Sequence, residues 1–128
     1  MRKKEPISCW RVASCHCGAN QIEVKVTSKR LLACNCSICT KKGFFHLIVS
    51  REDVRERPSK ERDVYRFGSN IAEHYFCKRC GITPYYVPRS HPSGFSVNAR
   101  CLEDFDLDEF DLVPFDGKNW ERNIDKIR

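Results

Sequence analysis

The sequence has no long hydrophobic run. Its longest apolar stretch, residues 44–49, is interrupted by His46, whereas a membrane-spanning helix needs about 20 consecutive apolar residues. The basic residues 1–6 are not followed by an apolar stretch long enough for a signal peptide. We therefore expect a soluble protein that is neither membrane-bound nor exported, with a cytoplasmic location, or a nuclear one in a eukaryote.

The sequence also lacks internal repeats, low-complexity segments and linkers rich in glycine or serine. We expect a chain of 128 residues without such dividers to fold as one domain. A domain of this size buries roughly two-thirds of the surface that its unfolded chain exposes. We predict that the domain spans residues 9–121, between a flexible basic N-terminus, residues 1–8, and a C-terminal tail, residues 122–128.

Positive charge is in modest excess and is unevenly distributed. The chain has 23 Lys and Arg against 17 Asp and Glu; residues 1–100 carry a net charge of +11 and residues 101–128 carry −5. If seven cysteines bind two Zn²⁺ as thiolates, the overall charge falls from +6 to about +3. This charge is small for a dedicated nucleic-acid binder, so we do not expect nucleic acid to be the main partner.

Cysteine, in contrast, is abundant. The nine cysteines exceed what packing requires, and their odd number leaves at least one thiol unpaired in any disulfide scheme. In a reducing cytosol or nucleus, thiols stay free to hold metal. We therefore interpret most of the cysteines as zinc ligands.

Short alternating segments indicate a mainly β fold. Ile22, Val24 and Val26 alternate with polar residues, as in a half-buried strand. One or two short helices are expected, one of a turn or two between Ser50 and Pro58 and one near Asn119. Further strands are predicted at residues 31–34, 44–49, 64–67, 74–76, 83–87 and 95–99.

Two cysteine pairs predict a closed zinc site. Cys77 and Cys80 form a knuckle in which both sulfurs face one ion, and the following Gly81 permits a tight turn with positive φ. The knuckle needs two more ligands, and either of the other clusters offers them. The pair Cys15 and Cys17 completes a tetrahedral site and leaves no sulfur over, so we predict a structural zinc on these four cysteines.

The remaining cluster, Cys34, Cys36 and Cys39, offers three sulfurs and no obvious fourth ligand. An open coordination position is typical of a reactive zinc, so we predict a catalytic zinc here. Three thiolates leave the zinc unit with a net charge of −1, which favours an incoming thiol over water. Zinc lowers the pKa of such a thiol and holds it as a nucleophilic thiolate, for which an aldehyde carbon is a natural target.

Basic side chains near these motifs are candidates for holding the carboxylates of an anionic thiol. We predict substrate contacts from Lys41, Lys42 and Arg89, and note Lys78 and Arg79 as further cations close to the motifs.

The cysteine motifs resemble those of the glutathione-dependent formaldehyde-activating family, most closely its centromere protein V branch. The resemblance covers roughly residues 10–121 and is carried by Cys15-His16-Cys17-Gly18, Cys34-x-Cys36-Ser37-x-Cys39, Cys77-x-x-Cys80-Gly81, Pro88-Arg89-Ser90, Gly94-Phe95, residues 98–102, Phe115-Asp116-Gly117 and Trp120. It implies a β-rich, Mss4-like zinc fold with two Zn²⁺ per chain and the division of ligands given above. It further implies a carbon–sulfur lyase reaction, the reversible joining of glutathione and formaldehyde as S-hydroxymethylglutathione.

Two alternatives stay open. A fourth ligand from His46, His16, Cys9 or Cys101 would close the second site and make both zincs structural. His46 itself is interpreted as a hydrogen-bonded core residue before it is considered as a general base. The domain could also be a non-catalytic zinc module that contacts nucleic acid, chromatin or a protein; its affinity for nucleic acid would then fall steeply with salt.

Overall fold

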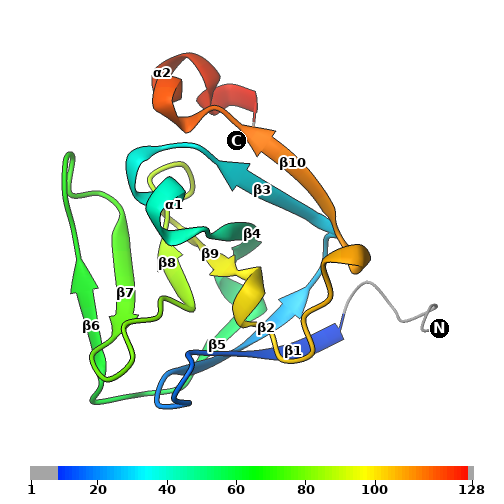
Figure 1. Ribbon diagram of the computed structural model, residues 1–128, viewed down its shortest axis with the longest axis vertical. Coiled ribbons are helices and arrows are strands. Elements are labelled where there is room, and N and C mark those ends of the chain that lie inside the picture. Colours follow the sequence, from blue (N-terminus) through cyan, green and yellow to red (C-terminus); the bar gives the residue numbers. More distant parts are fainter. Residues whose placement is uncertain (1–8, 127–128) are drawn as a thin grey trace.

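A computed structural model describes residues 9–126 and has the mainly β architecture that the sequence predicts (Figure 1). The predicted N-terminal segment 1–8 lies outside the described residues, as do residues 127–128. The longest helix of the described part has six residues, far fewer than a membrane span requires. The described strands and α-helices are β1 (Cys9–Ser14), β2 (Gln21–Val26), β3 (Arg30–Cys34), α1 (Ser37–Lys42), β4 (Phe45–Ser50), β5 (Val54–Glu56), β6 (Arg62–Tyr65), β7 (Glu73–Cys77), β8 (Tyr85–Val87), β9 (Gly94–Asn98), β10 (Asp111–Phe115) and α2 (Trp120–Asn123).

The described strands form two sheets. The smaller sheet has the antiparallel order β1-β2-β5, and the larger has the order β10-β3-β4-β9-β8-β7-β6. All neighbours in the larger sheet are antiparallel except β10 and β3, which run parallel. This parallel pair brings the end of the chain beside the strand that leads into the middle cysteine cluster.

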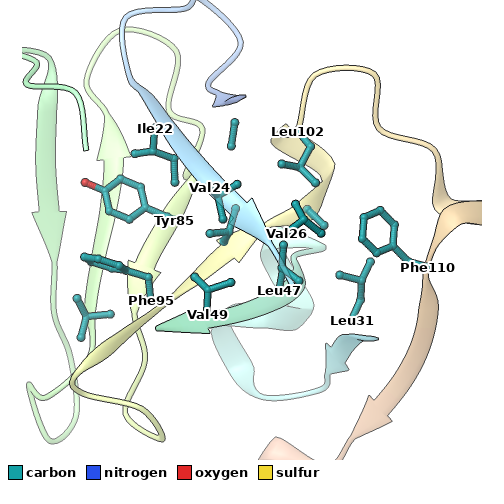
Figure 2. Packing of buried hydrophobic residues seen from close by; sticks show 14 residues of the cluster. Ile22, Val24, Val26, Leu31, Leu47, Val49, Tyr85, Phe95, Leu102 and Phe110 are labelled. Carbon is teal, nitrogen blue, oxygen red and sulfur yellow. The ribbon is translucent and has the colours of Figure 1, made fainter. Parts of the chain in front are cut away.

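The core lies between the two sheets (Figure 2). Strand β2 alternates between half-buried and buried residues, as predicted, and its buried side is formed by Ile22, Val24 and Val26. These side chains pack in one cluster with residues of the larger sheet that include Leu47, Val49, Tyr85 and Phe95. Because burial of one such aliphatic or aromatic side chain contributes about 1.5–3 kcal/mol, this cluster contributes strongly to holding the two sheets together.

The other face of the larger sheet carries a different set of side chains. Successive residues of a strand point to opposite faces, so His46 and Ile48 of β4 lie opposite the core residues Leu47 and Val49. The same alternation puts Tyr86 of β8 and Ser96 of β9 on this second face. The buried His46 and Ser96 and the half-buried Tyr86 on this face require hydrogen-bond partners, and Cys39 of helix α1 contacts His46 there.

The predicted strands are present, with boundaries shifted by one or two residues, and the helix near Asn119 is α2. The expected helix after Ser50 is a single 3-10 turn, Arg51–Asp53. The predicted domain boundary after residue 121 falls inside α2, and Ile124 beyond it is buried.

Among the described strands and α-helices, four were not predicted, namely β1, β5, β10 and α1. Strand β10 contains Pro114, which has no N–H for a sheet and is tolerated because β10 is an edge strand. Helix α1 is too short for a helical period to be visible, and β5 has only three residues.

Candidate functional site

The first cysteine cluster gathers four sulfur atoms from two distant turns. Cys15 and Cys17 lie between β1 and β2, while Cys77 and Cys80 lie at the end of β7 and just beyond it. The four Sγ atoms lie within 4.8 Å of one another, with 3.8 Å between Cys15 and Cys17 and 3.6 Å between Cys17 and Cys77. A tetrahedral Zn²⁺ with Zn–S bonds of about 2.3 Å places its sulfurs about 3.8 Å apart. The cluster therefore fits a closed zinc site.

Backbone N–H groups support the sulfur atoms of this cluster. The N–H of Asn20 donates to Cys15 Sγ at 3.3 Å, and that of Arg79 donates to Cys77 Sγ at 3.4 Å. Burial opposes ionisation of Cys77, but the N–H groups of Cys80 and Arg79 lower the pKa of its thiol to about 6. Gly81 has the predicted positive φ, 81°, which turns the chain back so that its N–H bonds the Cys77 carbonyl. The loop is thus shaped to present thiolates.

The second cluster consists of Cys34, Cys36 and Cys39, called here the trio. Cys34 ends β3, Cys36 precedes the first residue of α1, and Cys39 lies in its first turn. Their Sγ atoms also lie within 4.8 Å of one another. A strand end followed at once by a helical turn therefore gathers three sulfurs from six consecutive residues.

The trio favours ionisation at one sulfur. The side chains of Cys34 and Cys39 hydrogen-bond Cys36 and lower its pKa to about 2, with a further contribution from the N–H groups of Cys39 and Ile38 at the start of α1. The same contacts raise the pKa of Cys39. Because thiolates rather than thiols bind metal, a cation in the trio would ionise all three sulfurs.

No fourth ligand joins the trio among residues 9–126. The three sulfurs of the trio are all within 4.8 Å of one another, and no ligand atom of His46, His16, Cys9 or Cys101 joins them within that distance. His46 Nε2 lies 3.2 Å from Cys39 Sγ, but it is not within 4.8 Å of all three sulfurs. The described side chains therefore provide three ligands for this second site.

A cavity of about 460 Å³ opens over the trio. Its walls are largely apolar and aromatic, with Phe67, Tyr86 and Phe115 among them. Arg89 and Lys118 supply positive charge, and the described residues that line the cavity include no carboxylate. The cavity is large enough for a ligand of a few hundred daltons and favours an anionic one.

The chain segment after β10 closes one side of the cavity. Phe115 of β10 pairs with Cys34 of β3. The Asn35 side chain donates to Asp116 Oδ1 at 2.9 Å and accepts from the Lys118 N–H at 2.9 Å. Gly117 lies so close to the trio that a Cβ there would overlap Cys34 Sγ and lie 3.0 Å from the Cys36 Cβ. Only glycine therefore fits at residue 117 without moving the cysteine loop.

The family model of the glutathione-dependent formaldehyde-activating enzyme matches residues 11–114, a range that includes all seven cysteines of the two clusters. The chain belongs to this glutathione-dependent formaldehyde-activating family. A crystal structure of a Rhodobacter sphaeroides protein is similar to it, with 33% sequence identity and a TM-score of 0.71. That match covers 80% of this chain and 97% of the other.

In this member of the formaldehyde-activating family, the predicted basic residues separate into two groups. Arg89 lines the cavity and lies 3.4 Å from Glu121 in an ion pair. Lys41, Lys42, Lys78 and Arg79 are absent from its lining. Lys42 instead donates to Thr83 Oγ1 at 2.7 Å, and burial lowers its pKa. Of the three predicted substrate contacts, only Arg89 lies at the cavity.

The sequence reasoning missed several residues of the cavity wall. His74 and Tyr86 stack at 4.6 Å between ring centroids, and burial lowers the pKa of His74 to about 4. His46, also with a pKa lowered to about 4 by burial, lies next to Tyr86. Strand alternation could have assigned these rings to one face, but only the pairing of β4, β9, β8 and β7 places them together. No sequence pattern indicated Lys118, because it reaches the cavity only through the parallel pairing of β10 with β3.

Proposed function

We propose that both clusters bind Zn²⁺ and that the chain is a carbon–sulfur lyase-type enzyme of its family. The reaction is the reversible addition of a small thiol such as glutathione to formaldehyde, giving S-hydroxymethylglutathione. The observation that carries this proposal is the trio, which provides three sulfurs and lines the 460 Å³ cavity. Membership of the family supports the choice of thiol and aldehyde.

The first cluster is assigned a structural role. Its four sulfurs satisfy a tetrahedral ion without an outside ligand. The ion would join the β1–β2 turn to the end of β7, which are distant in sequence. A reducing compartment suits this site, because there the cysteines stay free to bind metal.

The trio is assigned the reactive role. A zinc ion held by three thiolates would lower the pKa of a fourth, visiting thiol and keep its sulfur nucleophilic. The residues around the trio bind and orient that visitor. Arg89 and Lys118 attract the carboxylates of glutathione, and the apolar wall with Phe67 and Phe115 keeps water from the reacting sulfur.

The reaction involves no change in oxidation state. In the forward direction, a bond forms between the thiol sulfur and the aldehyde carbon, and the proton of the thiol ends on the carbonyl oxygen. In the reverse direction, the hydroxyl proton is lost, the carbon–sulfur bond breaks, and formaldehyde and thiol are released.

Calorimetric titration of glutathione into the zinc-loaded protein tests the proposal. We expect binding by the wild type and its loss in Cys36→Ser, which removes one sulfur of the trio. S-methylglutathione is the matched ligand control, because it keeps both carboxylates but has no thiol, and it should bind more weakly than glutathione. Equal binding of the two ligands, or no binding of glutathione, would contradict the proposal.

Turnover is measured separately, because thiols also add to formaldehyde in water. Exchange of ¹³C-formaldehyde with S-hydroxymethylglutathione, followed by NMR, should be faster with wild-type protein than with buffer or with Cys36→Ser. Binding without faster exchange would favour the non-catalytic zinc module. A steep salt dependence of binding to DNA or RNA would then identify nucleic acid as its partner.

A further inference from the structure

A buried chain of hydrogen bonds leads from the trio into the larger sheet. His46 Nε2 lies 3.2 Å from Cys39 Sγ. On the other side of the ring, His46 Nδ1 lies 3.0 Å from Ser96 Oγ and 3.2 Å from the Tyr86 hydroxyl. His46 is 4% exposed and Ser96 is fully buried, so water does not replace these contacts. Both ring nitrogens of His46 therefore have protein partners.

The partners determine which nitrogen carries the proton. If Cys39 is a metal ligand, as the proposed function requires, its sulfur is a thiolate with no proton to donate. The 3.2 Å contact is then a hydrogen bond only if His46 Nε2 carries the hydrogen. Nδ1 is left as an acceptor, and the hydroxyl of Ser96 or Tyr86 can donate to it. This tautomer gives each ring nitrogen of His46 a hydrogen-bond partner.

We propose that His46 is a positioning residue for the second metal site. Its Nε2–H holds the Cys39 sulfur in place and withdraws part of the negative charge of that thiolate. A donor of this kind matters most where three thiolates share one divalent ion, because their summed charge exceeds that of the ion. The proposal rests on the proposed zinc site but not on the identity of the thiol or aldehyde.

The sheet holds the ring in the orientation that the hydrogen bonds need. His46 pairs with Asn98 across β4 and β9, and Tyr86 pairs with Ser96 across β8 and β9. The Ser96 hydroxyl therefore comes from the strand next to β4, and the Tyr86 hydroxyl from the strand beyond it. The ring also packs against Phe44 at 4.5 Å and Tyr86 at 5.6 Å between centroids. These contacts restrict rotation of the imidazole and make His46 a rigid support for Cys39.

The tautomer of His46 is the first test. Long-range ¹H–¹⁵N NMR of the zinc-loaded wild type distinguishes a protonated Nε2 from a protonated Nδ1 and from a nitrogen bound to metal. We expect His46 with hydrogen on Nε2. A proton on Nδ1 alone, or direct binding of Nε2 to the ion, would overturn the proposal.

A pair of variants is the second test. His46→Gln keeps an N–H donor at a similar reach, whereas His46→Leu removes it. Loss of a hydrogen-bond donor to a metal-binding side chain typically weakens metal affinity about 10–100-fold. We expect this decrease in affinity in His46→Leu and a smaller decrease in His46→Gln. Cobalt(II) titration reports both the affinity and the sulfur-to-cobalt charge-transfer band, which should shift in His46→Leu and less in His46→Gln.

The second test needs a control that separates a general loss of folding from a loss of metal affinity at the trio. The four-sulfur cluster serves as the internal control, because it should bind cobalt with unchanged affinity in both variants. Equal losses in the two variants, or no loss and no band shift in either, would contradict the role of the donor. Neither measurement uses glutathione, so a failed thiol-binding experiment leaves this inference open to its own test.

Discussion

The two cysteine clusters differ in how much chain they connect and in what surrounds them. In the first cluster, Cys17 meets Cys77 from 60 residues away. In the trio, all three sulfurs come from residues 34–39. The first cluster offers four ligands, while the trio offers three and lines the cavity.

This difference separates folding from chemistry. Closing a long loop orders much of the chain, so an ion in the first cluster would stabilise the whole domain. The trio is already gathered by a strand end and a helical turn, and an ion there adds little to the fold. Variants in the first cluster should therefore act mainly on stability, whereas variants in the trio should act mainly on metal and ligand binding in a folded domain.

The largest expected effect is that of Cys80→Ser, which removes one ligand of the first cluster. A structural zinc contributes about 10–16 kcal/mol of apparent binding free energy, comparable with the total stability of a domain, about 5–15 kcal/mol. We expect loss of the folded state, measured by circular dichroism and thermal unfolding. Cys9→Ser, outside both clusters, is the control and should fold. A cooperative transition at the wild-type temperature in Cys80→Ser would refute the structural role.

Gly117→Ala should affect the trio and spare the first cluster. The added Cβ would overlap Cys34 Sγ, and overpacking of this kind typically costs about 1–3 kcal/mol. We expect the metal content to fall from two ions per chain toward one, with the domain still folded. Metal analysis combined with thermal unfolding measures both. Full retention of two ions would show that the segment after β10 does not shape the trio.

The sequence allowed much of this comparison to be anticipated. The spacing of Cys77 and Cys80 and of Cys15 and Cys17 grouped the same four sulfurs that the structure brings together, because ligand number and tetrahedral geometry leave few pairings. Alternation in residues 22–26 predicted the buried face of β2 correctly. Local patterns of this kind are encoded within a few residues.

The walls of the cavity could not be anticipated in the same way. Lys118 and Gly117 reach the trio through the pairing of β10 with β3, whose partners lie about 80 residues apart in the sequence. His46 and Ser96 meet through the register of β4 and β9. Single-sequence patterns give the face of a strand but not its neighbour or register. Lys41 and Lys42 were chosen for closeness in sequence, and the fold directs Lys42 to Thr83.

A matched pair of lysine variants tests whether a lysine in the cavity contributes more to glutathione binding than a lysine outside it. Lys118 lines the cavity, whereas the exposed Lys41 does not. One exposed ion pair is worth roughly 0.2–1 kcal/mol, so Lys118→Ala should raise the Kd for glutathione up to about fivefold. Lys41→Ala should leave it unchanged. Titration calorimetry at low and high salt checks this, and equal effects of the two variants would count against the proposed anion contact.

A further expected effect is on the pH dependence of stability and arises from His74 in the cavity wall. Burial lowers its pKa from 6.5 to about 4, so the unfolded chain takes up this proton before the folded one does. The free energy of unfolding should therefore fall as the pH drops from about 6.5 to about 4. NMR titration of the His74 ring measures the pKa, and His74→Gln should flatten this part of the stability profile. A ring that titrates near 6.5 in the folded protein would contradict the burial argument.

The central claim is that the second ion keeps one position free for a visiting sulfur. X-ray absorption of the zinc-loaded protein, with a metal count for the wild type and Cys36→Ser, tests it directly. We expect two zinc ions, one with four sulfur ligands and one with three sulfur ligands plus a fourth ligand that glutathione replaces with its own sulfur. A second ion closed by a side chain of this protein, or a spectrum that glutathione leaves unchanged, would contradict it.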